Sequence, residues 1–246
     1  MCEVDKLYTI QNRTVDTVLD TLSFQKQEVK PMVKLGKTII LGDSYSTFEG
    51  YIPEGHVVYY SPKDEHNSRV TRVEQTWWHQ LMAATDSELV LNNSWSGSTI
   101  GYTGYEKEDY THLCFNTRLD KMYDEGILDD IDTLLIFGGT NDDWCGAPEG
   151  ELKFEGWTKE DMYCALPAIG RLFCRVAEIL PDKKVYAIIN TELKPCIHEA
   201  LIEAASRNGV KTICLSNIDK EWGHPSDVGM TQIKDQLLNF FENEEV

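Results

Sequence analysis

Five short apolar runs are the feature of this sequence that most restricts its fold. Each run is rich in β-branched residues, is continuous rather than alternating, and ends at a glycine or a polar residue. They occupy residues 38–41, 89–92, 133–137, 184–189 and 212–215. Such runs are typical of strands that are buried on both faces of a parallel sheet. The pattern therefore predicts a sheet of five parallel strands.

Apolar residues at helical spacing lie between these runs and after the last one. They are found at 70–82, 166–179, 197–205 and 226–241. Pro181 would end the second helix, Gly209 would close the third, and Ser226 is a suitable N-cap for the last. Strands that alternate with helices imply βαβ units, so we expect an α/β fold of three layers, an α/β/α sandwich.

The length of 246 residues lies between one and two domains of about 150 residues. We expect one α/β domain over residues 36–246, preceded by an N-terminal extension of unclear role over residues 1–35. Within that extension, residues 14–22 have a partly helical pattern. The apolar content of 41% is enough for a sizeable core, which excludes wholesale disorder.

The net charge of −18 restricts the partners of the chain. A strongly acidic protein repels phosphate backbones and anionic lipid, so nucleic acid and membrane surfaces are not expected partners. No run approaches the roughly 18 apolar residues of a spanning helix, and we expect no membrane insertion. The sequence does not determine the oligomeric state.

The seven cysteines are odd in number, and no two are spaced as CxxC, so neither a disulfide framework nor a zinc site is expected. This usage favours a reducing compartment, and the N-terminus does not have the pattern of a signal peptide. We therefore expect a cytoplasmic protein. The alternative is an exported protein whose signal has been removed, with Cys2 as a lipid-attachment point.

Residues that could carry chemistry follow the predicted strands. Ser44 comes after the first strand, Gly97 after the second and Asn141 after the third, and His224 precedes the last helix. The carboxyl ends of parallel strands form the ligand-binding edge of such a sheet. Taken singly, each residue also fits a helix cap, a turn or an exposed loop. Taken together, they supply a nucleophile, a base and amide donors for acyl transfer.

The same four blocks resemble the SGNH (GDSL-like) hydrolase family, whose name gives the serine, glycine, asparagine and histidine of its motifs. The resemblance covers about residues 36–242. Its blocks are Gly-Asp-Ser-Tyr-Ser at 42–46, the segment ending at Gly97, Gly-Thr-Asn-Asp at 139–142, and His-Pro at 224–225 with Gly-Met at 229–230. It implies a flavodoxin-like sandwich that uses no metal and no organic cofactor.

The resemblance also implies a role for each residue. Ser44 would be the nucleophile, and His224 would accept its proton and pass it to the leaving alcohol. The N–H groups of Ser44 and Gly97 and the side-chain amide of Asn141 would form the oxyanion hole. A serine is a weak nucleophile at its free pKa, which is why it needs an adjacent base.

The acid of the expected Ser-His-acid triad departs from the family pattern. The family usually has aspartate three residues before the histidine, where this chain has Glu221. Asp219, two residues earlier, is a rival for orienting His224. A third arrangement is a dyad in which a backbone carbonyl holds the ring.

We expect a serine esterase or deacetylase that hydrolyses small acyl esters, acetyl esters in particular. Long loops follow the predicted strands, and their tyrosines and tryptophans suit sugar rings, so the alcohol is a small molecule or a carbohydrate. The first alternative is a non-catalytic ligand- or carbohydrate-binding module on the same fold. The second is a nucleotide or flavin binder, which the lack of a phosphate-binding glycine motif after the first strand opposes.

Overall fold

A computed structural model describes residues 33–63 and 66–244 of the chain. Its centre is a parallel sheet of five strands in the order β2-β1-β3-β4-β5. The strands are β1 (Lys37–Gly42), β2 (Glu88–Ser94), β3 (Thr133–Phe137), β4 (Lys184–Ile189) and β5 (Lys211–Cys214). This is the flavodoxin-like strand order. The predicted five-stranded α/β fold is confirmed.

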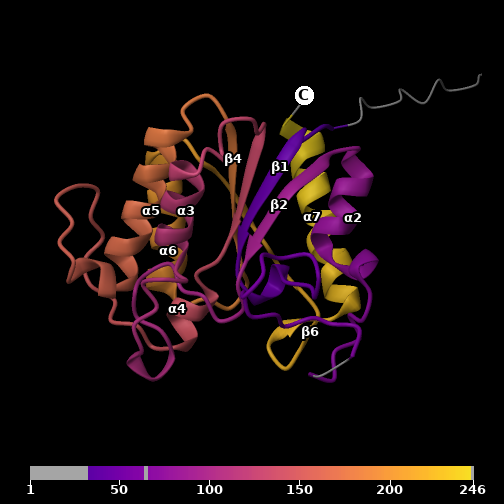
Figure 1. Ribbon diagram of the computed structural model, residues 1–246, viewed down its shortest axis with the longest axis horizontal. Coiled ribbons are helices and arrows are strands. Elements are labelled where there is room, and N and C mark those ends of the chain that lie inside the picture. The colour runs from indigo at the N-terminus through magenta and orange to yellow at the C-terminus, as the bar shows by residue number, and fades with distance from the viewer. Residues whose placement is uncertain (1–32, 64–65, 245–246) are drawn as a thin grey trace, which may run out of the picture. The chain divides into compact units, whose positions relative to one another are not determined.

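Helices cover both faces of the sheet, so the domain has three layers (Figure 1). On one face lie α3 (Phe115–Asp124), α5 (Ala165–Ile179) and α6 (Pro195–Arg207), and on the other lie α2 (Trp77–Thr85) and α7 (Asp227–Glu244). Short α4 (Thr140–Trp144) and the small antiparallel hairpin of β6 (Lys220–Glu221) and β7 (His224–Pro225) lie together at one end of the sheet.

Alternate side chains of the central strands enter two different apolar cores. On β1, Ile39 and Leu41 pack in the core under α3, α5 and α6, whereas Ile40 packs in the core under α2 and α7. All three side chains are fully buried. A strand with both faces covered needs apolar residues at every position, which explains the continuous run in the sequence.

The expectation of full burial is wrong for the two edge strands. The first half of β2 alternates between exposed and half-buried residues, and Val90 is exposed. Both terminal residues of β5 are also exposed. An edge strand has one neighbour and its helices cover it only in part, so its outer positions face solvent.

The helix boundaries agree with the sequence in the second half of the chain and differ in the first. Helix α5 ends two residues before Pro181, and the Ser226 hydroxyl accepts the Gly229 N–H at the start of α7, as an N-cap does. In contrast, α2 begins only at Trp77, after a separate 3₁₀ turn. Helix α3 lies where the sequence analysis expected no helix.

No helix within residues 33–63 and 66–244 combines the length and apolar character needed to cross a bilayer. The partly helical pattern predicted at residues 14–22 lies outside the described residues, as does Cys2.

Candidate functional site

Strand register brings the sequence blocks to one level of the sheet. Gly42, the last residue of β1, pairs with Ser94 at the end of β2 and with Phe137 at the end of β3. The loops that carry Ser44, Gly97 and Asn141 therefore leave neighbouring strands at the same edge. The order of the strands, with β1 between β2 and β3, makes these three loops adjacent.

Ser44 begins a tight 3₁₀ turn directly after β1. The Asp43 carboxylate caps this turn by accepting the Tyr45 N–H at 3.0 Å. Gly42 is needed for space, because a Cβ there would lie 2.5 Å from the Ser94 Oγ. Close packing of the ends of β1 and β2 thus fixes where the turn that carries Ser44 begins.

His224 reaches the serine from the β6–β7 hairpin. The two turn residues, Trp222 and Gly223, have φ values of 52° and 81°, as in the tight turns that suit a two-residue hairpin. The His224 Nε2 lies 3.0 Å from the Ser44 Oγ, and its Nδ1 lies 3.3 Å from the Trp222 carbonyl oxygen. A carbonyl can only accept, so this contact places the proton on Nδ1 and leaves the Nε2 lone pair toward Ser44.

The two candidate acids lie next to the hairpin but contact other groups. Glu221 is paired opposite His224 in the hairpin, yet its carboxylate lies 2.7 Å from the Arg69 Nε. The Asp219 carboxylate accepts the Ser226 hydroxyl and lies 3.4 Å from the Arg69 Nη2. Among the described residues, neither carboxylate is hydrogen-bonded to His224. An orienting role for either stays a prediction, and the observed partner of Nδ1 is a backbone carbonyl.

Aromatic rings surround the imidazole of His224. Tyr59 stacks on its face, while Trp144 and Tyr45 approach with ring centroids at 5.7 and 5.3 Å. This burial lowers the pKa of His224 to about 4, because a charged ring would lose its hydration, although the Trp222 carbonyl acts in the opposite direction. The imidazole is therefore neutral at physiological pH, as a general base must be.

Three amide donors of the predicted oxyanion hole are available. The N–H groups of Ser44 and Gly97 have no hydrogen-bond acceptor among the described residues. Gly97 has a φ of 82°, a conformation that favours glycine, and a Cβ at this position would meet no atom within 4 Å. No neighbouring atom therefore blocks this side of Gly97, where a ligand could approach.

The Asn141 side chain is held by hydrogen bonds at both ends of its amide. Its Nδ2 donates to the Ser98 carbonyl at 3.0 Å, and its Oδ1 accepts the Tyr105 hydroxyl at 2.8 Å. Because Nδ2 carries two hydrogens, the second one remains for a ligand. Ser98 follows Gly97 in the chain, so the same bond ties the third block to the second.

Buried Arg118 links the loops from behind. Its guanidinium donates to the carbonyl of Gly42 at 3.1 Å, to the Ser98 Oγ at 2.9 Å and to the carbonyl of Leu113 at 2.8 Å. It also donates to the carbonyl of Asn93. The nucleophile loop and the Gly97 loop are thus fixed on one planar cation.

Two buried carboxylates complete this support. Asp142 accepts the N–H groups of Ile100 and Gly101 at 2.9 and 3.1 Å, which fastens the loop after Gly97 to α4. Burial raises the pKa of Asp142 to about 6 and that of Asp43 to about 7. For Asp43, the Tyr45 N–H and the charge of Arg118 act in the opposite direction.

Sequence reasoning missed Arg118, and it placed Tyr59 and Tyr105 among the loop aromatics that suit sugar rings, without the contacts to His224 and Asn141 that the structure shows. Arg118 stands in an apolar helical pattern formed by Phe115, Leu119 and Met122. A charged residue within the buried stripe of a helix is an available signal for a buried cation. Tyr105 and Tyr59 lie in long loops, where no periodic pattern indicates which way a side chain points.

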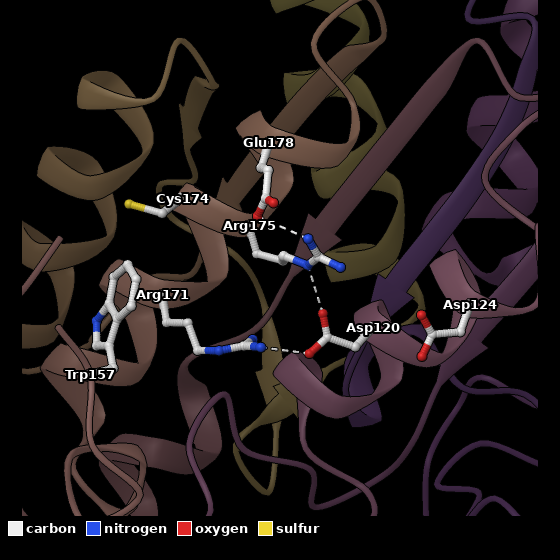
Figure 2. A pocket seen from close by; sticks show the side chains of 7 residues that line it. All are labelled: Asp120, Asp124, Trp157, Arg171, Cys174, Arg175 and Glu178. Carbon is white, nitrogen blue, oxygen red and sulfur yellow. Dashed lines mark hydrogen bonds and ion pairs between the residues drawn. The ribbon is translucent and has the colours of Figure 1, made fainter. Parts of the chain in front are cut away.

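A cavity of about 390 Å³ on α3 and α5 is a separate feature. Figure 2 shows Arg171 and Arg175 directed at the same carboxylate, that of Asp120, with contacts of 2.6 and 2.8 Å. Arg175 also pairs with Glu178 at 2.9 Å. Both guanidinium groups are already engaged, and none of the sequence-predicted site residues lines this cavity.

We expect Arg118→Met to lower the free energy of unfolding by about 3–5 kcal/mol, because three carbonyls and a hydroxyl would lose a buried charged donor. Urea unfolding measures this change. Arg207→Met is the matched control, since Arg207 is exposed and, among the residues that the structure describes, contacts only the Phe154 ring, at 4.1 Å. Its loss should cost about 0.5–1 kcal/mol. Equal losses in the two variants would contradict the role given to Arg118.

We expect the His224 imidazole to titrate near pH 4, well below the ordinary value of 6.5, because its ring is buried among aromatic side chains. The ring protons can be followed by NMR, with the His224→Gln spectrum for assignment. The pKa of His224 is higher in the unfolded chain than in the folded protein. The free energy of unfolding therefore falls as the pH decreases from about 6.5 through 4. A midpoint near 6.5 would contradict the burial described above.

Comparison with known proteins identifies the family of this fold. The sequence model of the GDSL-like Lipase/Acylhydrolase family matches residues 36–241. Curated proteins gave no match. The crystal structure of a candidate GDSL-like lipase from Bacteroides ovatus is 41% identical, with a TM-score of 0.80, over 85% of this chain and 99% of that one.

Two further structures extend the comparison. A candidate GDSL-like lipase from Bacteroides uniformis is 39% identical, with a TM-score of 0.76, over 83% of this chain and 95% of that one. A family two carbohydrate esterase from Clostridium thermocellum has a TM-score of 0.56 at 16% identity over 87% of this chain and 66% of that one, which shows a shared fold alone. From the family match and the two Bacteroides structures, this chain belongs to the GDSL-like lipase/acylhydrolase family.

Proposed function

We propose that this protein is a serine esterase or deacetylase that hydrolyses small acyl esters. The observation that carries the proposal is the 3.0 Å contact between the His224 Nε2 and the Ser44 Oγ. A hydroxyl hydrogen-bonded to a neutral imidazole is the arrangement that activates a serine. Membership of a family of lipases and acylhydrolases supports ester bonds as the target.

In the first half of the reaction, the Ser44 Oγ attacks the carbonyl carbon of the ester while its proton moves to the His224 Nε2. The carbonyl oxygen becomes an oxyanion. The N–H groups of Ser44 and Gly97 and the free Nδ2 hydrogen of Asn141 stabilise this charge. The intermediate then collapses to an acyl-serine, and His224 gives the proton to the departing alcohol.

In the second half, a water attacks the acyl-serine and His224 accepts a proton from it. The second tetrahedral intermediate collapses, the carboxylic acid leaves, and Ser44 regains its proton from His224. Throughout both halves the Trp222 carbonyl keeps the Nδ1 proton in place. The active group is thus a Ser-His dyad, in which a backbone oxygen takes the orienting role of the acid.

The proposed substrate has a small acyl group, acetyl in particular, and a carbohydrate or another small alcohol. Two exposed tryptophans belong to this site: Trp144, whose ring approaches the imidazole, is 45% exposed, and Trp222, whose carbonyl contacts Nδ1, is 81% exposed. Their flat apolar faces suit the faces of sugar rings. Carbohydrate esterases share this fold, but at 14–16% identity they support only the architecture.

We expect a fluorophosphonate to add once to the wild-type protein and not to Ser44→Ala, because only an activated serine reacts with this probe. Intact-mass spectrometry detects the adduct. His224→Gln should also fail to react, since it lacks the base, while circular dichroism shows that it is folded. A folded wild-type protein with no adduct would instead favour the non-catalytic binding module, and a ligand screen would then replace the screen of acetylated sugars and aryl esters.

Glu221→Gln and Asp219→Asn should each keep kcat/KM within about threefold, because neither carboxylate contacts the imidazole. Hydrolysis of a short aryl ester measures this. Both substitutions preserve shape and one acceptor oxygen, while they remove the charge and replace the other oxygen with an NH2 donor. A loss of about 10⁴-fold, of the size seen when the orienting acid of a triad is neutralised, would identify that residue as the acid.

A further inference from the structure

The ring of Tyr59 lies parallel to the imidazole of His224, with a centroid distance of 3.6 Å and an angle of 9° between the planes. We propose that Tyr59 is a positioning residue that clamps the His224 ring onto Ser44, in the place where a triad would use a carboxylate. This inference rests on the proposed hydrolase function and deepens it. The clamp acts through the ring face, so both ring nitrogens stay free for their in-plane partners.

Tyr59 is fastened to the turn that carries the nucleophile. Its backbone N–H donates to the Thr47 hydroxyl at 2.9 Å, and that hydroxyl donates to the carbonyl of Ser44 at 3.0 Å. Thr47 is fully buried. The Thr47 hydroxyl therefore links Tyr59 to Ser44, and the imidazole of His224 stacks on the Tyr59 ring. Tyr59 thus fixes the position of His224 relative to Ser44.

The outer face of the tyrosine ring is also covered. His66 stacks on it at 4.5 Å with an angle of 8°, and Tyr60 packs edge-on at 4.8 Å. Three rings thus lie in one column, with His224 at its inner end. A ring held from both sides has little freedom to tilt.

The residue next to Tyr59 holds the histidine strand itself. The hydroxyl of Tyr60, which is fully buried, donates to the Pro225 carbonyl at 2.8 Å. The Glu49 N–H donates in turn to the Tyr60 carbonyl at 3.0 Å. Two adjacent tyrosines thus hold two consecutive residues. Tyr60 binds the backbone of Pro225, and Tyr59 packs on the side chain of His224.

The hydrogen bond that restrains the imidazole at Nδ1 is weak, which is why this clamp matters. The Trp222 carbonyl contacts Nδ1 at 3.3 Å, a long hydrogen bond. Glu221, the opposite residue in the hairpin, is engaged by Arg69. Rotation of the imidazole about its bond to Cβ would drive its edge into the tyrosine ring, so the stack restricts the motion that the long hydrogen bond permits.

The decisive comparison is Tyr59→Leu against Tyr59→Phe. The leucine variant removes the planar ring and should lower both kcat for a short aryl ester and the rate of fluorophosphonate labelling. A misplaced base can cost about 10²-fold, and KM should change by less than about threefold. Tyr59→Phe keeps the stacked ring and should stay within about threefold of wild type. Tyr59→Met replaces the leucine variant if the latter does not fold.

A pH profile separates positioning from loss of structure. The Ser44 hydroxyl contacts His224, and the rings of Tyr59, Tyr45, Tyr60 and Trp144 pack around it. Besides burial, the nearby cationic groups His66, beyond the Tyr59 ring, and Lys220 lower its pKa. Loss of the Tyr59 ring admits water to His224, so the acid limb of the labelling rate should move upward from about pH 4 toward the ordinary value of 6.5. His66→Ala removes only the outer ring of the column and keeps the stack of Tyr59 on His224, so it should lower kcat less than Tyr59→Leu does.

The outcomes distinguish this inference from the function on which it rests. Folded wild type that is not labelled overturns the proposed hydrolase. Labelled wild type with an unaffected leucine variant overturns only the clamp. Equal losses in Tyr59→Leu and Tyr59→Phe also overturn the clamp, because the hydroxyl rather than the stacked ring would then be responsible. Loss in the leucine variant, with retention in the phenylalanine variant and a shifted acid limb, supports it.

Discussion

Burial of the Arg118 guanidinium is the constraint on which the arrangement of the site loops depends. A cation inside a protein must have its donors satisfied, and the donors of this one are satisfied by backbone and hydroxyl oxygens of separate loops. The Gly42 carbonyl precedes the nucleophile turn, and Ser98 follows the residue of the predicted oxyanion hole, Gly97. The same interaction therefore stabilises the fold and sets the spacing of the proposed active groups.

The histidine is positioned differently, from a hairpin at the periphery of the sheet. Two carboxylates of this region, those of Asp219 and Glu221, are engaged with Arg69 and with the N-cap serine of α7. These acids hold the hairpin in place through ion pairs and a hydrogen bond. A backbone carbonyl and aromatic packing then orient the ring, and neither of them is charged. A low-polarity surrounding also keeps the imidazole neutral, the form that accepts a proton.

Much of the fold could be predicted because its causes are local. The runs that became β1, β3 and β4 are continuous since both faces of those strands are buried, and Pro181 and Ser226 bound helices α5 and α7 by backbone chemistry. Helix α3 was missed because Arg118 and Asn116 interrupt its apolar pattern. Both are buried, and their polar groups are satisfied by partners distant in sequence, which no local pattern records.

The sequence by itself determined the five strands, helices α2, α5, α6 and α7, the family, and which serine, glycine, asparagine and histidine lie at the ends of the elements. Those features depend on residue type and spacing along the chain. Only the tertiary structure decided that Nδ1 of His224 faces a carbonyl, that Arg69 engages Glu221, and that Tyr59 covers the imidazole. The partners of loop side chains depend on three-dimensional packing and on competition between nearby charges. The spacing of residues in the sequence contains no information on either.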